Sequence, residues 1–529
     1  MQLKKFIWVP VFVAVSNMVS GQNAAPENWF NLDKGEDKIE GMSTEKAYKK
    51  LLVNKKAKPI IVGVLDSGVD EDHEDLKNIM WVNEDEIPGN NIDDDKNGYV
   101  DDIYGWNFIG GKDGKNVDKD SYELTRVYKV KDEKFRNMLE SNMTDADKEE
   151  YKEFLKLKAE FLEKSIQAKT MFEVVSKTKT NFEIIENAIG KGENINTDDL
   201  KNYKPSNSKE TAIINKLIGF MESGITYFDL KKEVMGMFDH YDKLANYAYN
   251  LNFDPRYIVG DDYNNQTEKY YGNNDVTGPD ASHGTHVAGI IAAQRDNYIG
   301  IKGVANNVRI MSVRCVPDGD ERDKDVANAI IYAVDNGAKV INMSFGKSFP
   351  WNKKIVDDAV KYAESKDVLL VHGAGNDGKD IDVNINYPNP NYNNENKRAQ
   401  NWIEVGAYSW IKGKNKIASF SNYGKKNVDV FAPGVSIYST TPGSNYESFD
   451  GTSMASPCTA GVAALIRAYF PDLTASQVRN IIMKSTVKVK GKVNLPGSNK
   501  TTKLKKISVT GGFVNTYKAL KLADKMSKY

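Results

Sequence analysis

Ser453 lies in a segment of small residues, Gly451 to Gly461 (GTSMASPCTAG), that leads into an apolar run. A serine in such a place can cap a helix or act as a nucleophile. A serine hydroxyl attacks a carbonyl only when a base takes its proton, a carboxylate orients that base and donors stabilise the oxyanion. The residues that decide between the two interpretations must therefore lie elsewhere in the chain.

Three distant segments offer the missing groups. Asp66 follows the apolar run PIIVGVL, His283 lies in SHGTHVAGI, and Asn376 lies in the glycine-rich turn GAGNDG. A neutral imidazole suits the base, a carboxylate fixes its tautomer, and a side-chain amide can donate to an oxyanion. The four residues predict acyl transfer at a serine. The alternative is that His283 is a packed core histidine and Ser453 only a helix cap.

The elements that must carry these residues alternate between strand and helix patterns. Asp66 ends a continuous apolar run, which is typical of a strand buried on both faces. From Val304 to Phe470, strand patterns such as VRIMSVRCV and KVINMSF alternate with amphipathic helix patterns. This alternation predicts an α/β fold with a doubly wound, mostly parallel sheet. Asp66 would then lie at the carboxyl edge of the sheet, where such folds place their chemistry.

Residues 121–255 have a different character and are rich in Lys and Glu. A helix is predicted from Thr144, as its cap, to Gly190, and a second helical stretch over about 209–250. The first carries an apolar stripe with a period of seven, which we interpret as packing rather than a ligand site: Phe154, Phe161, Ala168, Val175, Phe182 and Ile189, with Leu157, Met171 and Ile185 between them. The segment is predicted to be an all-α hairpin or small bundle inserted into the α/β domain.

The motifs resemble those of the subtilisin-like serine proteases, or subtilases. They are VLDSGVD, SHGTHVAGI, INMSFG, GAGNDG and APGVSIYSTTPGSNYESFDGTSMASP, and the resemblance covers about residues 57–110 and 275–522. It implies that Asp66 orients the base, that His283 is the general base and acid, and that Ser453 is the nucleophile. It also implies an oxyanion hole made by Asn376 and the Ser453 backbone N–H, with no cofactor needed for catalysis.

The same resemblance implies where a peptide would bind. Ser344, Phe345 and Gly346 look like an edge strand that pairs with an extended peptide. Gly373, Ala374 and Gly375 look like the facing wall of the pocket for the residue before the cut. Small residues at these positions lead us to expect a roomy, apolar pocket.

Two features depart from the family pattern. The interval from Asp66 to His283 is 283 − 66 = 217 residues, and the helical insertion accounts for most of it. We expect this insertion to leave the core near the catalytic rim and to narrow access or to contact substrates or partners. Cys458 stands where many relatives carry histidine, and we do not interpret it as the nucleophile. Cys315 and Cys458 are both expected to be small buried residues.

The stretch NNIDDDKNGYVDD has the spacing of a calcium loop. The candidate ligands Asp93, Asp95, Asn97, Tyr99 (through its carbonyl) and Asp101 occupy loop positions 1, 3, 5, 7 and 9, with Gly98 at position 6. Position 12 is Tyr104 instead of the usual glutamate, although Asp102 lies close by. A structural calcium ion is one interpretation, and a solvated acidic turn is the other.

The N-terminus and the bulk composition bear on location and partners. Residues 1–21 have two lysines, an apolar stretch and small residues near Gly21, which predicts a signal peptide; an uncleaved membrane anchor is the alternative. Residues 22–56 would be a short extension or propeptide, and 57–120 and 256–529 the two parts of the peptidase domain. With 72 basic and 73 acidic residues, the charge gives no reason to expect nucleic-acid binding.

These observations lead to one expected function and two alternatives. We expect a secreted or periplasmic serine endopeptidase that cleaves protein or peptide substrates through an acyl-enzyme, with no membrane span after signal removal. The first alternative is an exported binding or scaffold protein that acts through the helical insertion. The second is a processing protease of narrow specificity. The oligomeric state is left open by the sequence.

Overall fold

The computed structural model describes residues 24–528, so the predicted signal peptide at 1–21 lies outside the described residues. The chain divides into two compact units. A sheet unit is formed by Ala25–Glu123 and Asp254–Tyr529, and a helical unit contains Leu124–Phe253. Among residues 24–528, no helix is both long enough and apolar enough to cross a membrane.

The sheet unit is built around nine strands in the order β10-β13-β7-β6-β5-β4-β1-β3-β2. Every neighbouring pair is parallel except β10 with β13. The strands are β1 (Ile60–Asp66), β2 (Gly105–Asn107), β3 (Val308–Arg314), β4 (Ala338–Met343), β5 (Leu369–Gly373), β6 (Trp402–Tyr408), β7 (Val430–Pro433), β10 (Val487–Lys488) and β13 (Gly512–Phe513). The predicted α/β fold with a mostly parallel sheet is confirmed.

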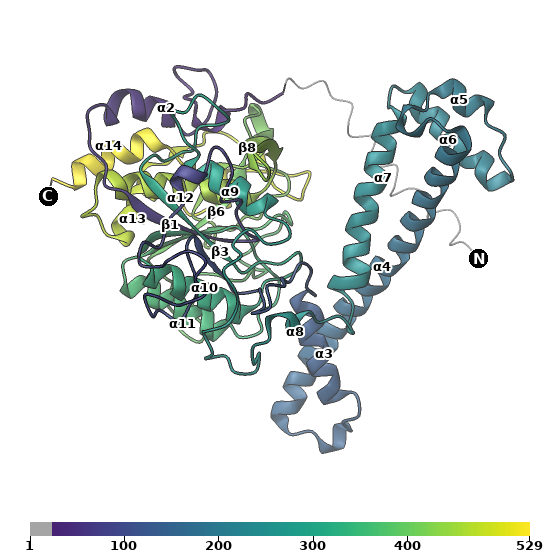
Figure 1. The fold of residues 1–529 in the computed structure, drawn as a ribbon, viewed down its shortest axis with the longest axis horizontal. Helices are drawn as coiled ribbons and strands as arrows, with labels where there is room; N and C mark the ends of the chain where they lie inside the picture. Colours follow the sequence, from purple (N-terminus) through teal and green to yellow (C-terminus); the bar gives the residue numbers. More distant parts are fainter. Residues whose placement is uncertain (1–23, 529) are drawn as a thin grey trace. The chain divides into compact units, whose positions relative to one another are not determined.

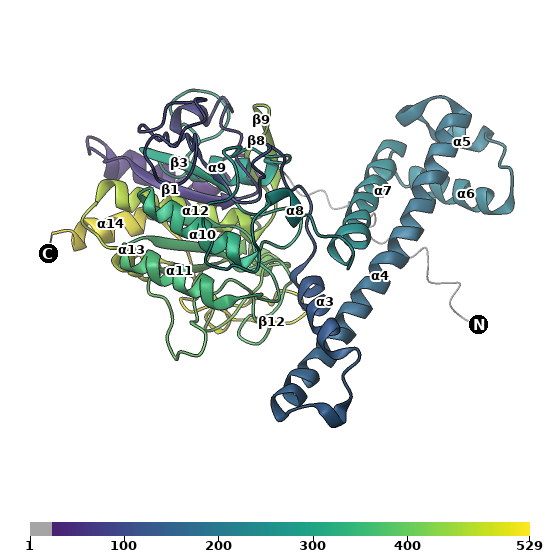
Figure 2. The same cartoon turned by 60° about the horizontal axis from the view of Figure 1, so that its bottom comes forward.

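Helices cover both faces of this sheet (Figures 1 and 2). Because successive strand residues point to opposite faces, the apolar runs supply two cores. One core includes α9 (Ser282–Ala292), α12 (Thr452–Tyr469), α13 (Ala475–Ser485) and α14 (Thr516–Met526). The other includes α10 (Asp323–Asp335) and α11 (Lys353–Ser365). The remaining elements of this unit include α2 (Thr44–Ala47), α8 (Arg256–Val259), β8 (Ile437–Thr441), β9 (Asn445–Phe449), β11 (Val493–Asn494) and β12 (Thr501–Thr502).

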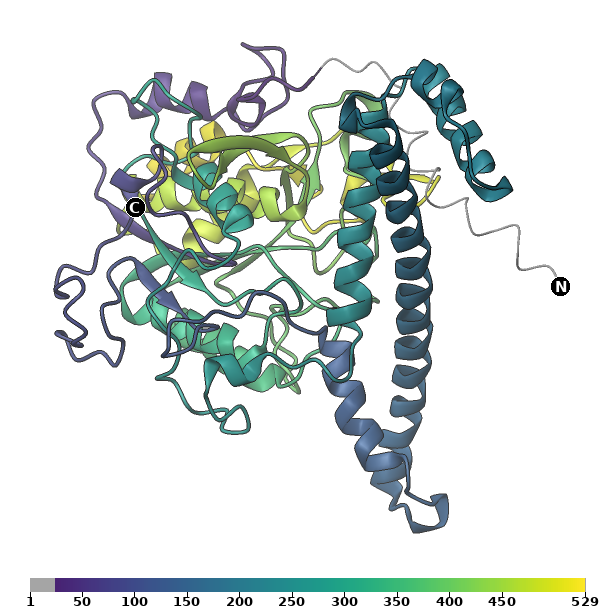
Figure 3. The ribbon, with the colours of Figure 1, turned by 45° about the vertical axis from the view of Figure 1, so that its right-hand side comes forward.

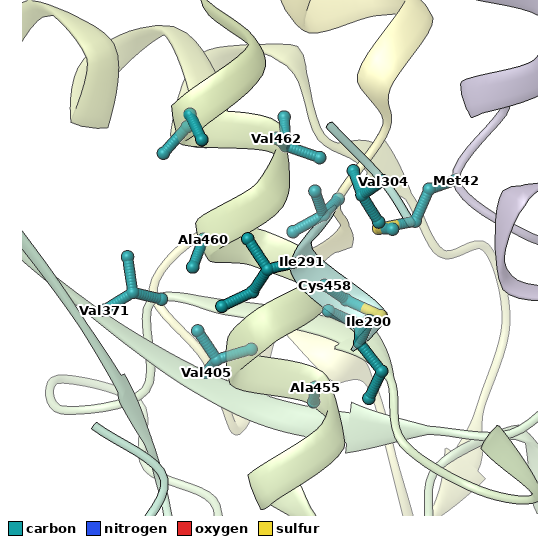
Figure 4. Close-up of a cluster of buried hydrophobic side chains, with 14 of the residues drawn as sticks. Met42, Ile290, Ile291, Val304, Val371, Val405, Ala455, Cys458, Ala460 and Val462 are labelled. Atoms are coloured by element: carbon teal, nitrogen blue, oxygen red, sulfur yellow. The ribbon is translucent and has the colours of Figure 1, made fainter. Parts of the chain in front are cut away.

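The first core surrounds α12, the helix that carries Ser453. Figure 4 shows Cys458 on this helix among apolar side chains that include Ile290, Ile291 and Val405. Cys458 and Cys315 are both buried and free of disulfides, as expected. Burial raises the pKa of the Cys458 thiol well above its ordinary value, so this thiol is not an alternative nucleophile.

The N-terminal extension is part of the same core. Trp29 and Phe30 are fully buried although they precede the first strand of the sheet. The Trp29 indole N–H donates to the carbonyl of Ser436 at 3.0 Å, and its ring lies 5.8 Å from that of Tyr408. The extension therefore packs against strands of the sheet unit rather than apart from them.

The helical unit is a small bundle with one long helix, α4 (Asp145–Ile189) (Figure 3). Thr144 closes a capping box at its start and Gly190, with φ 70°, ends it, as the sequence predicted. The buried face of α4 includes Phe154, Leu157, Phe161, Ala168, Val175, Phe182 and Ile185, whereas Met171 and Ile189 are only partly buried. The other helices are α3 (Glu123–Phe135), α5 (Thr197–Asn202), α6 (Ser208–Glu222) and α7 (Tyr227–Asp242).

The second helical stretch differs from the expectation of one segment over about 209–250. It is divided into α6 and α7, because Gly224 adopts φ 97° and Thr226 caps a new helix start. The residues between α4 and α6 also contain α5, which Asn196 caps. Local capping side chains therefore set more helix boundaries than the apolar pattern indicated.

Candidate active site

Asp66 and His283 are brought together from opposite ends of the long interval. Asp66 is the last residue of β1 and His283 is the second residue of α9. Their Oδ1 and Nδ1 atoms lie 2.7 Å apart, and the Asp66 side chain is 2% exposed. The close approach requires glycine at position 284, since a Cβ there would lie 2.0 Å from the Gly68 carbonyl oxygen. The geometry is that of a histidine whose tautomer is fixed by a buried carboxylate.

The electrostatics around His283 favour the charged, doubly protonated form of its ring. Burial alone would lower its pKa, but the charge and hydrogen bond of Asp66, with the charge of Asp280, raise the pKa above its ordinary value. The His283 side chain remains 38% exposed. Its imidazolium form is therefore stabilised while the ring stays accessible from outside.

Ser453 is the second residue of α12, so its backbone N–H belongs to the free N–H groups of a helix start. Its hydroxyl donates to the Ser344 carbonyl at 3.1 Å. In the described part of the chain, no hydrogen bond joins it to His283. Bonds between a nucleophile and its base are often loose before substrate binds.

Asn376 is held from one side only. Its Oδ1 accepts hydrogen bonds from the Thr452 backbone N–H at 2.9 Å and the Thr452 hydroxyl at 3.0 Å. The Asn376 Nδ2 group makes no hydrogen bond within residues 24–528, and Asn376 lines the same pocket as Ser453. The fixed oxygen thus leaves the amide N–H₂ as a donor for that pocket.

Thr452 is a functional residue that the sequence reasoning missed. Its Oγ1 also accepts from the Gly375 N–H at 3.0 Å, so it joins the glycine-rich turn to the start of α12. The only sequence feature that could have indicated this role was the position of Thr452 directly before Ser453. A threonine at a helix start is more often only a cap, however, and its partners lie far away along the chain.

A pocket of about 330 Å³ lies beside Ser453, and most of the predicted substrate residues line it. They are joined by three residues that the sequence did not indicate, Thr452, Asp377 and Asn386; the lining is Ser344, Phe345, Gly346, Gly373, Gly375, Asn376, Asp377, Asn386, Thr452 and Ser453. The expectation of an apolar pocket is therefore wrong, since amide, carboxylate and hydroxyl groups dominate the lining. Ala374 does not face the pocket, because its side chain is fully buried in the first core.

A second pocket, of about 220 Å³, lies beside His283. Its lining includes Asp66, Asp280, His283, Arg314 and Ser344. Because Ser344 also lines the pocket beside Ser453, the two pockets meet at this residue. The predicted base and nucleophile therefore border adjoining hollows of one surface.

Two of the predicted calcium ligands, Asp93 and Asp101, accept hydrogen bonds from the backbone of the loop itself. Asp93 accepts backbone N–H bonds from Asn97 and Gly98, and the carboxylate of Asp101 accepts them from Gly89 and Asn91. Tyr99 is buried and its N–H donates to the Asn97 side chain.

Three other carboxyl groups converge in this loop. Glu86, Asp95 and Asp102 each offer an oxygen within 4.8 Å of the others, and only Asp95 was among the predicted ligands. Burial, with repulsion from Asp95, raises the pKa of Asp102 to about 6 even though Tyr332, Asn83 and Asn97 donate to it. Carboxylate oxygens in this arrangement suit a hard cation such as Ca²⁺.

Comparison with known proteins adds an independent line of evidence. The model of the subtilase family matches residues 57–506. A thermophilic serine proteinase of Bacillus sp. (strain AK1) is 44% identical over 202 residues, which is 38% of this chain and 44% of that protein. Subtilisin DY of Bacillus licheniformis is 41% identical over 199 residues, which is 37% of this chain and 68% of the relative.

A solved structure of a protease from Pseudoalteromonas arctica PAMC 21717 is 30% identical. It aligns with 47% of this chain and 78% of its own, with a TM-score of 0.39. The aligned segments of these relatives thus span less than half of the present chain.

Proposed function

Because the chain belongs to the subtilase family, we propose that it is a serine endopeptidase that hydrolyses peptide bonds through an acyl-enzyme on Ser453. The observation that carries the proposal is the 2.7 Å bond between Asp66 and His283 at the edge of a pocket that adjoins the pocket of Ser453 and Asn376. Export by the predicted signal peptide, to the periplasm or beyond, is part of the same proposal.

The proposed reaction has two halves. The Ser453 hydroxyl turns from the Ser344 carbonyl, passes its proton to Nε2 of His283 and attacks the scissile carbonyl carbon. The oxyanion accepts hydrogen bonds from Asn376 Nδ2 and the Ser453 backbone N–H. His283 then gives the proton to the leaving amine, and the C–N bond breaks. In the second half water attacks the ester, His283 again takes and returns a proton, and the acid product leaves.

The contacts of each residue support its proposed role. Asp66 holds Nδ1 of His283 and stabilises the imidazolium, which agrees with the raised pKa of that ring. Thr452 occupies the oxygen of Asn376, so that the amide cannot turn its acceptor towards the negative charge. The start of α12 adds the positive end of a helix to the same place.

The test is replacement of Ser453 by alanine. We expect hydrolysis of casein and of a peptide ester to fall by at least about 10³-fold, while the melting temperature stays close to that of the parent. A fluorophosphonate should label the parent at Ser453 and leave the variant unlabelled. Activity that survives the substitution in purified protein would refute the mechanism.

The same material separates the alternatives. An exported scaffold predicts that the parent neither hydrolyses these substrates nor reacts with the fluorophosphonate. A processing protease of narrow specificity predicts labelling together with one cleavage motif in a peptide library. A broad endopeptidase predicts labelling with many cleavages.

The polar lining contributed by Asp377 and Asn386 leads us to expect polar side chains among those accepted before the cut.

A further inference from the structure

A histidine and a glutamate lie buried behind the predicted substrate strand, Ser344–Gly346, and the proposed reaction uses neither. His372 is on β5 and Glu404 on β6, where the two residues are partners in parallel register. Their side chains are 0% and 2% exposed. Buried ionisable groups are rare unless their polar atoms are satisfied, so their partners show what the pair does.

All four polar atoms of the pair have partners. Nε2 of His372 lies 2.8 Å from the carbonyl oxygen of Phe345, and Nδ1 lies 2.9 Å from Oε1 of Glu404. The other oxygen of Glu404 accepts from the Trp402 indole N–H at 2.8 Å. A carbonyl can only accept, so Nε2 carries a proton, and a second proton lies between Nδ1 and Glu404. The pair is therefore neutral overall and can remain buried.

The bond to Phe345 fixes the direction of the next backbone N–H. The carbonyl of Phe345 and the N–H of Gly346 belong to one planar trans peptide, so they point in opposite directions. With the carbonyl held inward by His372, the Gly346 N–H points away from the sheet interior. Gly346 is exposed, and neither its N–H nor its carbonyl makes a hydrogen bond within the described chain. An extended peptide could pair with these free groups.

We propose that His372 and Glu404 are positioning residues: they hold the Phe345–Gly346 peptide so that Gly346 can bind the backbone of an extended substrate. The inference rests on the proposed peptidase function and adds two buried positioning residues to it. Only substrates with several residues before the scissile bond have a backbone that reaches Gly346, so only their hydrolysis should depend on the pair.

The principal test removes the pair without leaving a lone buried charge. In a double variant, His372→Phe with Glu404→Leu, apolar side chains of similar size replace both groups, a change that proteins often tolerate. We expect kcat/KM for a succinylated tetrapeptide anilide to fall about tenfold, mainly through KM, because about one backbone hydrogen bond is lost. Hydrolysis of a single-residue ester should fall much less, by under about twofold.

Two matched changes separate positioning from general damage to the fold. Glu404→Gln can still accept from Trp402 and donate to Nδ1, so it should restore most of the tetrapeptide activity. Tyr408→Phe changes one buried atom on the same strand, at a hydroxyl without a hydrogen-bond partner in the described residues, and should not alter the ratio of the two substrates. If the double variant does not fold, the single variants His372→Gln and His372→Leu replace it. Selective loss of the tetrapeptide activity is then expected only in His372→Leu, because leucine has no donor for the Phe345 carbonyl.

The outcomes distinguish this inference from the proposed function. Equal losses on both substrates, or no loss on the tetrapeptide, would overturn the positioning role while leaving the peptidase intact. A parent protein that hydrolyses neither substrate would instead refute the proposed function. Selective loss of the tetrapeptide activity, with rescue in Glu404→Gln, supports the assignment.

Discussion

Asp280 acts on His283 through its charge alone. It precedes α9, lines the pocket beside His283 and raises the pKa of that ring, but in the described part of the chain no hydrogen bond links the two side chains. Its Oδ1 accepts from the Ser282 N–H at 2.9 Å, and an asparagine can keep that bond. The substitution Asp280→Asn therefore changes charge with little change in structure.

We expect Asp280→Asn to move the acid limb of the kcat/KM profile to lower pH. In the proposed mechanism the neutral form of His283 is the base, so activity should be lost as pH falls through the His283 pKa. Removing a nearby negative charge lowers that pKa, and the effect is larger at low salt than at high salt. The measurement is a pH profile with a peptide anilide at two ionic strengths.

The control for this prediction is Asp472→Asn. Asp472 is exposed and follows α12, an 18-residue helix about 27 Å long, at the end opposite Ser453. It should leave the profile where it is. A shift of Asp280→Asn towards higher pH, or none at low salt, would show that Asp280 does not stabilise the imidazolium.

For single residues, the sequence predicted those that belong to a short local motif. Asp66, His283, Asn376 and Ser453 each belong to a short segment at a strand end or helix start. Asn386 and the His372–Glu404 pair could not be predicted in this way. Their roles come from contacts across strands and loops, and a histidine inside an apolar strand shows no local sign of the carbonyl that it binds.

Among the elements, the N-terminal extension was the least predictable. Its polar composition gave no strand pattern, so the sequence left open whether it was a propeptide. The structure shows that two adjacent aromatic residues, Trp29 and Phe30, are buried in the core of the sheet unit. A pair of residues is too short to show a period of 2 or 3.6, and burial through such a pair cannot be predicted from patterning.

We expect Trp29→Ala to destabilise the sheet unit by about 3–5 kcal/mol, the usual cost of removing a large buried aromatic side chain. Val53→Ala is the matched control in the same segment, because Val53 is 59% exposed and should cost under about 0.5 kcal/mol. Urea denaturation followed by residual peptidase activity would measure both. If the two variants were equally stable, the extension would be separable from the core, as a propeptide can be.

The acidic loop leads to a prediction about metal removal. If calcium binds near Glu86, Asp95 and Asp102, the melting temperature should rise with Ca²⁺ and fall with EDTA, since a ligand 100-fold above its Kd adds about 2.7 kcal/mol to the folded state. Asp95→Ala should remove this dependence, whereas Asp472→Ala should keep it. If the melting temperature of the parent protein changed with neither calcium nor EDTA, the loop would be a solvated acidic turn and not a calcium site.

At the scale of the whole molecule, ion pairs hold the two chain segments that flank the helical unit. Arg322 at the start of α10 bonds Asp120 at 2.7 Å and Asp254 at 2.8 Å, so both flanks are tied to one buried side chain. Glu123 is paired with Lys347 at 2.7 Å, and Lys347 directly follows the predicted substrate strand, Ser344–Gly346. The sequence placed the insertion at 121–255, and the compact helical unit contains Leu124–Phe253. These ion pairs link residues more than 60 positions apart, so they cannot be predicted from a local sequence pattern.

Because one arginine holds both flanks, the helical unit should be removable without unfolding the sheet unit. We expect a variant in which a short Gly-Ser linker replaces 124–253 to hydrolyse a tetrapeptide anilide at close to the parental rate. If the insertion narrows access to Ser453, cleavage of a folded protein should rise severalfold relative to that peptide. Parallel assays on a folded protein and on the same protein after reduction and unfolding measure this ratio. Unchanged cleavage of both, with the peptide rate preserved, would show that the helical unit does not select substrates, and it would direct the search for its role towards binding partners.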